Sequence, residues 1–203
     1  MITLILLGLA FCVGLFLLVV ASRPSHFRIS RSAQIAAPPA TVFAHLNDLH
    51  LFQDWSPWAR KEPEAQMNFE GPRAGVGAAV SWRGKKVGEG RMTLTESRPA
   101  ELVQFRLEFL KPFAVTNTAE FDFRADGDAT TITWSMTGEN RFLCKAIGLF
   151  VDMDKMCGRD FEQGLENLRA IAENEAGPGT ASGRTTPPIT LGHSGVARTA
   201  LAH

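Results

Sequence analysis

The stretch Leu102–Phe109, which reads LVQFRLEF, alternates apolar and polar side chains from Val103 onward. A period of two residues predicts a β-strand with one buried face and one face in water. The same alternation returns in residues 115–124 and 131–137, and the Asp-Gly-Asp sequence at 126–128 between them is typical of a hairpin turn. We therefore predict three consecutive antiparallel strands.

Downstream of these strands the apolar period changes from two residues to 3.6. From Phe142 to Ile171 apolar side chains recur every three or four positions, which predicts a long C-terminal helix, interrupted near residues 154–158. Gly158 and Gly164 each cost about 1 kcal/mol in a helix interior. We expect the backbone to pass close to a neighbour at these glycines, or the helix to bend there.

Upstream, residues 27–35 alternate like a strand, with Arg31 as a charged intruder on the apolar side. Prolines 38 and 39 end this strand, and two short helices are predicted at 40–46 and 49–52. Further strands are predicted within residues 67–96, between turns rich in glycine and proline. The predicted fold is α+β, with a curved antiparallel sheet of about seven strands wrapped round the C-terminal helix.

Residues 51–58, LFQDWSPW, place two of the four tryptophans in a predicted loop. Because tryptophan favours burial, Trp55 and Trp58 either plug the core or cap a gap between sheet and helix. A strongly curved sheet leaves such a gap, which we predict to be a ligand-binding cavity. Its predicted lining is Trp55, Trp58, Phe105, Phe109, Asn117, Phe121, Trp134, Met136, Phe150 and Met153. In this site Asn117 either orients a ligand or satisfies a neighbouring backbone group.

The first 21 residues, MITLILLGLAFCVGLFLLVVA, carry no charged side chain. About twenty apolar residues match a hydrocarbon core about 30 Å thick, so we predict a transmembrane helix at 1–22 and a juxtamembrane linker at 23–26. A cleaved signal peptide is the alternative, but the run is long and no basic residue precedes it. Arg23, Arg28 and Arg31 follow the span, which predicts a single-pass protein with its soluble domain in the cytoplasm.

The other boundaries follow from composition. Residues 27–174 form the predicted folded domain, and from 177 to 203 the chain is rich in Gly, Ser, Thr, Pro and Ala, which predicts a disordered tail. The formal net charge of the 203 residues is zero, and no basic stripe occurs, so a nucleic-acid partner is not expected.

Motifs for catalysis or metal binding are missing from the sequence. There is no CxxC, HExxH, GxSxG or P-loop pattern. His45 and His50 lie near the predicted short helices, and we expect both on the surface. No catalytic residue, metal or cofactor is predicted.

Three segments together resemble the SRPBCC superfamily, the START-like helix-grip proteins often labelled polyketide cyclase/dehydrase. They are FRISRSAQIAAPPATVFAHLNDL with FQDWSPW in residues 27–58, MTLTES with its following proline in 92–99, and GRDFEQGLENL in 158–168. The resemblance covers residues 27–172. It implies a seven-stranded sheet that grips the C-terminal helix round a hydrophobic cavity, used for lipids, sterols, quinones or polyketides. It carries over no catalytic position.

The expected function is membrane-anchored binding of a hydrophobic small molecule, such as a lipid, quinone or polyketide, between the sheet and the C-terminal helix. One alternative is a cyclase, dehydratase or hydrolase that works in the same cavity and uses Asn117 or His50. The other is a protein-interaction module that the N-terminal helix merely localises.

Overall fold

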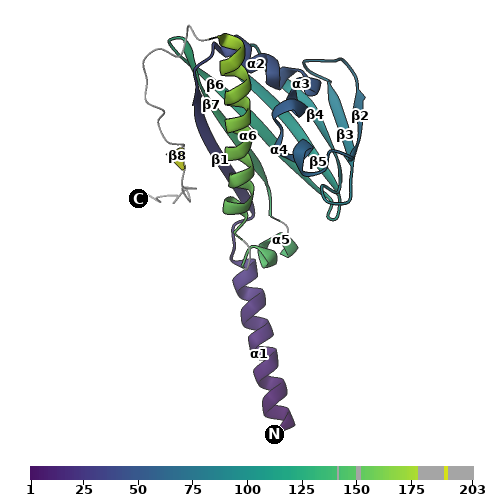
Figure 1. Cartoon of the computed structure of the whole chain (residues 1–203). Helices are drawn as coiled ribbons and strands as arrows, with labels where there is room; N and C mark the ends of the chain where they lie inside the picture. Colours follow the sequence, from purple (N-terminus) through teal and green to yellow (C-terminus); the bar gives the residue numbers. More distant parts are fainter. Residues whose placement is uncertain (141, 150–151, 178–189, 192–203) are drawn as a thin grey trace.

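The computed structural model describes residues 1–140, 142–149, 152–177 and 190–191 (Figure 1). The helices are α1 (Ile2–Ala21), α2 (Pro39–Asn47), α3 (Leu49–Trp55), α4 (Pro57–Lys61), α5 (Phe142–Ile147) and α6 (Met153–Ala176). The strands are β1 (His26–Ile35), β2 (Gln66–Glu70), β3 (Ala79–Arg83), β4 (Glu89–Arg98), β5 (Leu102–Lys111), β6 (Val115–Asp126), β7 (Ala129–Glu139) and β8 (Thr190–Leu191).

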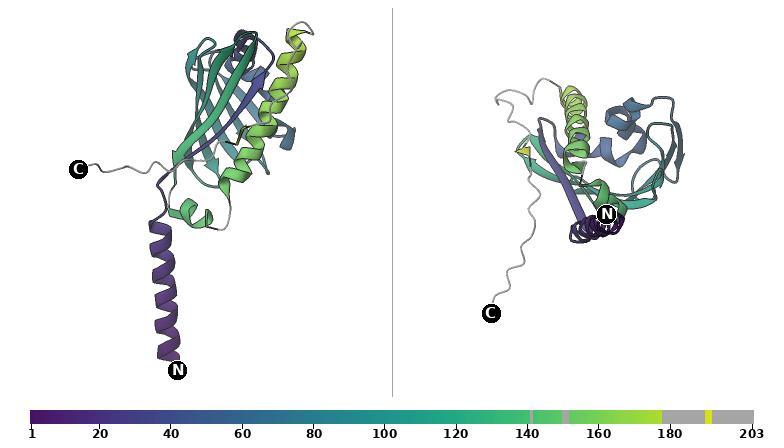
Figure 2. Two further views of the ribbon diagram at one scale, coloured as in Figure 1. Left: turned by 90° about the vertical axis from the view of Figure 1, so that its left-hand side faces the viewer. Right: turned by 90° about the horizontal axis from the view of Figure 1, so that it is seen from below.

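The strands form one antiparallel sheet in the order β2-β3-β4-β5-β6-β7-β1-β8. Strands β1 to β7 are the seven that the sequence predicts, and β8 adds two residues beside β1. The sheet curves round α6 and the short helices α2–α4, while α1 projects away from the domain (Figures 1 and 2). The predicted α+β helix-grip fold is confirmed.

The register confirms the alternation that predicts the central strands. Phe105 pairs with Ala119, and Phe121 pairs with Trp134, so these side chains share the concave face. Thr118 and Thr133 lie on the opposite face, which none of the described helices covers (Figure 2). One buried face and one solvated face produce the observed period of two residues.

A cluster of aromatic rings joins the sheet to the helices. The Trp134 ring lies parallel to that of Phe161 on α6, with centroids 4.1 Å apart, and it stacks on Phe121 at 4.8 Å. The Trp55 ring of α3 meets Trp134 edge-on at 5.7 Å. All four rings are at most 3% exposed. This stacked core holds α3 and α6 against the concave face.

The C-terminal helical region differs from the prediction in where it breaks. It consists of α5 and α6, and Asp152 caps α6 by accepting a hydrogen bond from the backbone N–H of Lys155. The interruption therefore precedes residues 154–158, and Gly158 lies within α6.

A Cβ atom at Gly158 would collide with the Arg31 guanidinium, and one at Gly164 would lie 2.8 Å from the Trp134 ring. Close approach, rather than a bend, accounts for both glycines.

Arg31 is the charged residue on the apolar face of β1, and its burial there is explained by two carboxylates of α6. Its guanidinium is 2.8 Å from a Glu162 oxygen and 3.1 Å from an Asp154 oxygen, and the side chain is only 4% exposed. Burial of a guanidinium is tolerable when carboxylates pair with it. Arg31 thus fastens the start of α6 to the sheet, in the space that Gly158 leaves open.

The segment that contains the two tryptophans is more helical than predicted. Pro57 begins α4, a position that suits proline because its missing N–H would be unpaired there. Trp55 is fully buried and donates its Nε1–H to the His45 carbonyl oxygen at 3.1 Å, so this tryptophan plugs the core. His45 is also buried, 3.0 Å from a Glu175 oxygen, and the expectation that it lies on the surface is wrong.

The predicted tail, residues 177–203, falls mostly outside the described residues. Thr190 and Leu191 pair with Ser32 and Arg31 of β1 to form β8.

Candidate functional site

The concave face of the sheet is not covered evenly. Beneath α3 and α6 it is closed by aromatic rings, but at the β2 edge two adjoining grooves separate the sheet from α3 and α4. Their volumes are about 260 and 310 Å³. Together they reach the size range of small-molecule sites, about 300–1,000 Å³. These grooves are the candidate functional site.

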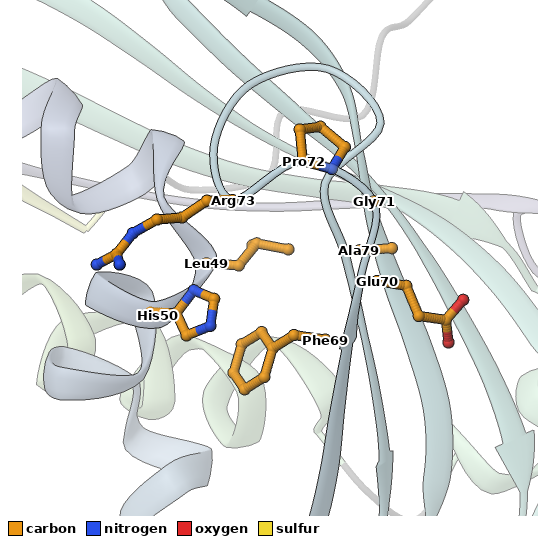
Figure 3. Close-up of a pocket in the computed structure, with 8 residues that line it drawn as sticks. All are labelled: Leu49, His50, Phe69, Glu70, Gly71, Pro72, Arg73 and Ala79. Carbon is orange, nitrogen blue, oxygen red and sulfur yellow. The ribbon is translucent and has the colours of Figure 1, made fainter.

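The first groove lies between α3 and the loop that follows β2 (Figure 3). It is lined by Leu49, His50, Phe69, Glu70, Gly71, Pro72, Arg73 and Ala79. Figure 3 shows the His50 and Phe69 rings facing each other, whereas the Glu70 carboxylate points away from them. That carboxylate pairs with Arg91 at 2.8 Å.

The second groove continues past α4 on the other side of the same two rings. It is lined by His50, Gln53, Ala59, Glu62, Pro63, Ala65, Met67 and Phe69. Most of these side chains are apolar, so this groove favours hydrophobic contacts.

His50 and Phe69 line both grooves and separate them. Their rings stack with centroids 4.1 Å apart and an interplanar angle of 14°. The contact joins α3 to β2 across the edge of the concave face. Because the His50 side chain is 46% exposed, solvent reaches this contact.

Met67 and Phe69 are large apolar side chains that α3 and α4 leave partly uncovered. They are 39% and 36% exposed, although they pair with Trp82 and Val80, which lie on the concave side. Exposed apolar side chains that gather in a groove mark a binding surface more often than isolated ones do.

Charged groups gather at one end of the first groove. The Asp48 carboxylate accepts hydrogen bonds from Arg73 Nε at 2.6 Å and from the His50 backbone N–H at 2.8 Å, and it lies 3.3 Å from His50 Nδ1. Burial opposes ionisation of Asp48, but the hydrogen bonds from Arg73 and His50 outweigh it and lower the pKa of Asp48. The carboxylate is therefore ionised at neutral pH beside the imidazole.

Glu62 has a structural role in the second groove. Its carboxylate accepts hydrogen bonds from the backbone N–H groups of Val87, Lys85 and Lys86, at 3.0, 2.8 and 2.8 Å. These bonds, that of Val87 first, lower the pKa of Glu62. The carboxylate fixes the turn between β3 and β4 against the C-terminal end of α4.

The residues predicted to line a cavity occupy different places. Trp55, Phe105, Phe121 and Trp134 belong to the stacked core, and Trp58 packs on its border, 5.7 Å from the Trp134 ring. Phe109, Asn117 and Met136 lie on the concave face, toward the end of the sheet that α1 joins. Phe150 lies outside the described residues, as does the side chain of Met153. None of the eight whose side chains are described lines either groove, and the contact of all ten residues with a ligand stays a prediction.

Asn117 is buried without a full set of hydrogen bonds. Its Nδ2 contacts the Met136 sulfur at 3.8 Å, and its Oδ1 has no partner among the described residues. Within the described residues the Asn117 amide makes no hydrogen bond to a backbone group, and its role toward a ligand stays a prediction. The amide rests on Gly138, where a Cβ atom would strike it.

Trp134 Nε1 is likewise buried and unpaired within the described chain. An unpaired buried polar group costs about 1–3 kcal/mol, which a hydrogen bond to a ligand would offset.

The sequence does not reveal the groove, because the pattern of β2 does not show which helices cover this strand. Met67 and Phe69 alternate with polar neighbours as in any half-buried strand, and no pattern shows that a helix fails to cover them. The described residues contain no group of His, Cys, Asp and Glu side chains suited to a metal ion.

Comparison with known proteins gives one family. The family model described as "Polyketide cyclase / dehydrase and lipid transport" matches residues 26–173. No curated protein matches the chain.

Three solved structures illustrate the fold. Protein MLL2253 from Mesorhizobium loti has a TM-score of 0.55 and 14% identity, over 73% of this chain and 98% of that protein. The Aha1 dimer from Colwellia psychrerythraea has a TM-score of 0.53 and 15% identity, over 72% and 96%. The di-domain ARO/CYC StfQ from the steffimycin biosynthetic pathway has a TM-score of 0.54 and 11% identity, over 75% and 52%.

At these identities the solved structures show the fold alone. The family model covers the chain from β1 almost to the end of α6, which is nearly the whole described domain. The curved sheet, the gripping C-terminal helix and this match agree. The chain therefore belongs to the polyketide cyclase/dehydrase and lipid transport family of the SRPBCC superfamily.

Proposed function

We propose that this chain binds a hydrophobic small molecule of the lipid, quinone or polyketide class while α1 holds it at a membrane. The observation that carries the proposal is the partly exposed pair Met67 and Phe69, which face α3 and α4 across an open groove. The family description, which names lipid transport, supports the ligand class.

Binding would proceed by burial of apolar surface. Each ligand methylene removed from water contributes about 0.8 kcal/mol before losses. The apolar tail would lie in the second groove against Met67, and a polar head would lie in the first groove near Arg73 and His50. Rotation of His50 away from Phe69 would join the two grooves. A ligand that also reaches below α6 would meet the unpaired atoms of Asn117 and Trp134.

The membrane part of the proposal rests on α1. An 18-residue window of this helix has a mean hydropathy of 3.0, and nearly all the side chains of the helix are exposed, so the domain does not use it as core. We place the domain in the cytoplasm, where Arg23 would follow the span. Arg31 supports this orientation less than the sequence suggests, because its charge is paired inside the domain.

The test is native mass spectrometry of the full chain released from detergent micelles. Wild type should carry one retained lipid-like molecule, and its intact mass should include residues 1–21. Phe69→Asp should lower the liganded fraction at least tenfold, because it places a charge against the apolar lining. The control is Val76→Asp, which places the same charge at a more exposed apolar residue outside both grooves. An empty wild-type chain, or equal ligand in both variants, would overturn the proposal.

An enzyme acting in the same groove is a second candidate, favoured by one contact. The Asp48 carboxylate lies 3.3 Å from His50 Nδ1, an arrangement that orients an imidazole as a general base. If the chain turns over its ligand, His50→Gln should abolish turnover even of the ligand that the variant still retains. Equal turnover by wild type and His50→Gln would remove His50 from any chemistry.

A further inference from the structure

The two ends of the sheet differ in the side chains they expose. The antiparallel register places the β3–β4 turn and the β5–β6 turn at the same end as the first residue of β1, because Glu89 pairs with Lys111 and His26 with Glu139. Since β1 follows α1 directly, this is the end nearest the apolar helix (Figure 1). We call it the anchor end, and define it as residues 83–89 and 110–115 with α5.

The anchor end exposes large apolar side chains. Leu110 and Phe113, at the β5–β6 turn, are 58% and 55% exposed. Phe142 and Ile147 of α5 are 52% and 38% exposed. Helix α5 lies against the C-terminal end of α1, so the apolar surface continues from the helix on to the domain.

Basic side chains surround these apolar residues. Arg83, Lys85, Lys86 and Lys111 are all exposed at the two turns. Two carboxylates near the turns are already engaged, because Glu89 pairs with Arg83 and Lys111, and Glu62 binds backbone N–H groups. At the opposite end, the β6–β7 turn carries exposed Asp126 and Asp128 instead.

The linker fixes this end close to the helix. Only residues 22–25 separate α1 from β1, and four residues span at most about 14 Å. The Ser25 carbonyl oxygen accepts a hydrogen bond from the Asn140 backbone N–H at 2.7 Å, and Ser25 Oγ accepts one from Lys145 at 3.0 Å. The headgroup layer on one side of a bilayer is about 5–8 Å thick, so a membrane-inserted α1 holds the anchor end within reach of it.

We propose that the anchor end docks on the surface of a bilayer that contains anionic lipids. Leu110, Phe113 and Phe142 insert among the headgroups, while Lys85, Lys86 and Lys111 contact lipid phosphates. This inference rests on the proposed membrane insertion of α1. Docking would also place the Met67 side of the candidate site toward the bilayer, because Met67 lies nearer the anchor end of β2 than Phe69 does. A lipid that leaves the bilayer therefore meets the apolar groove first.

The experiment uses the full chain with Cys12, Cys144 and Cys157 replaced by alanine. Phe113→Cys and, as a control, Val76→Cys carry an environment-sensitive nitrobenzoxadiazole label; Val76 is 59% exposed on the loop between β2 and β3. Each is reconstituted into vesicles of phosphatidylcholine with or without phosphatidylglycerol, and a headgroup-region spin-labelled lipid acts as quencher. Flotation of the vesicles reports insertion of α1.

We expect the label at 113 to shift to the blue in anionic vesicles and to be quenched at least twofold more than the label at 76. Charge reversal by K85E, K86E and K111E together should reduce the quenching of the label at 113 to that of the label at 76. High salt should reduce the difference in quenching between the two positions. If the chain floats but position 113 stays in water, docking is overturned and anchoring stands. If the chain does not float, anchoring fails and docking fails with it, whereas ligand retention is judged separately by mass spectrometry.

Discussion

The region beneath α6 and the β2 edge belong to the same concave face, yet one is closed and the other is open. Beneath α6, Trp134 is sandwiched between Phe121 and Phe161 at stacking distance. At the β2 edge, Met67 and Phe69 face only α3 and α4, which have seven and five residues against the 24 of α6. Because short helices cannot cover a whole strand, similar apolar side chains build a core in one region and a groove in the other.

The largest difference between the two regions should appear in stability. Trp134→Ala removes the ring on which four other aromatic rings pack, and we expect the free energy of unfolding to fall by about 3–5 kcal/mol. Phe69→Ala, at the open edge, should cost less than about 1 kcal/mol. Urea unfolding of the full chain in one detergent measures both. Equal losses would mean that the β2 edge is as closed as the core.

A smaller effect should arise where α6 meets β1. Gly158→Ala improves helix propensity by about 1 kcal/mol, but its methyl group must displace the Arg31 guanidinium. We expect a net loss of about 1–3 kcal/mol in the same urea measurement, as for overpacked cores. Met156→Ala, at an exposed position of the same helix, is the control and should change stability by about 0.5 kcal/mol or less. A stabilised Gly158→Ala variant would show that Arg31 does not fasten α6.

The smallest effect should be a pH dependence of stability that arises from Glu62 in the second groove. The folded-state pKa of Glu62 lies below its ordinary value of 4.5, so its contribution to stability is present above that pH and is lost as pH falls through the folded pKa. Glu62→Gln should therefore be less stable than wild type at neutral pH and approach it in acid. Parallel pH profiles for the two proteins would contradict the role of Glu62 in holding the β3–β4 turn.

The sequence predicts well those elements that have one wet and one buried face. Strands β5, β6 and β7 follow from alternation, because the concave face is covered along them. The sequence-based prediction places the break before α6 too far along the chain, because the Asp152 cap lies within a continuous apolar pattern. The buried positions of Arg31 and His45 depend on carboxylates more than a hundred residues away, which no local pattern reveals.

The candidate site is harder to predict than the fold. A large aromatic residue on a strand has the same pattern whether a helix covers it, as for Phe121, or leaves it open, as for Phe69. The difference depends on the reach of α3 and α4, which end at Trp55 and Lys61. Tryptophan and phenylalanine content therefore predicts the core, and the groove emerges only from the packing of helices on the sheet.

Photocrosslinking with a diazirine-bearing fatty acid shows whether a lipid occupies the grooves at the β2 edge. The full chain is reconstituted in vesicles, irradiated and digested, and the modified residues are mapped by mass spectrometry. We expect crosslinks on β2 and on α3–α4, including Met67 and Phe69, that an excess of unlabelled fatty acid abolishes. Crosslinks confined to α1, with none at the β2 edge, would contradict this expectation.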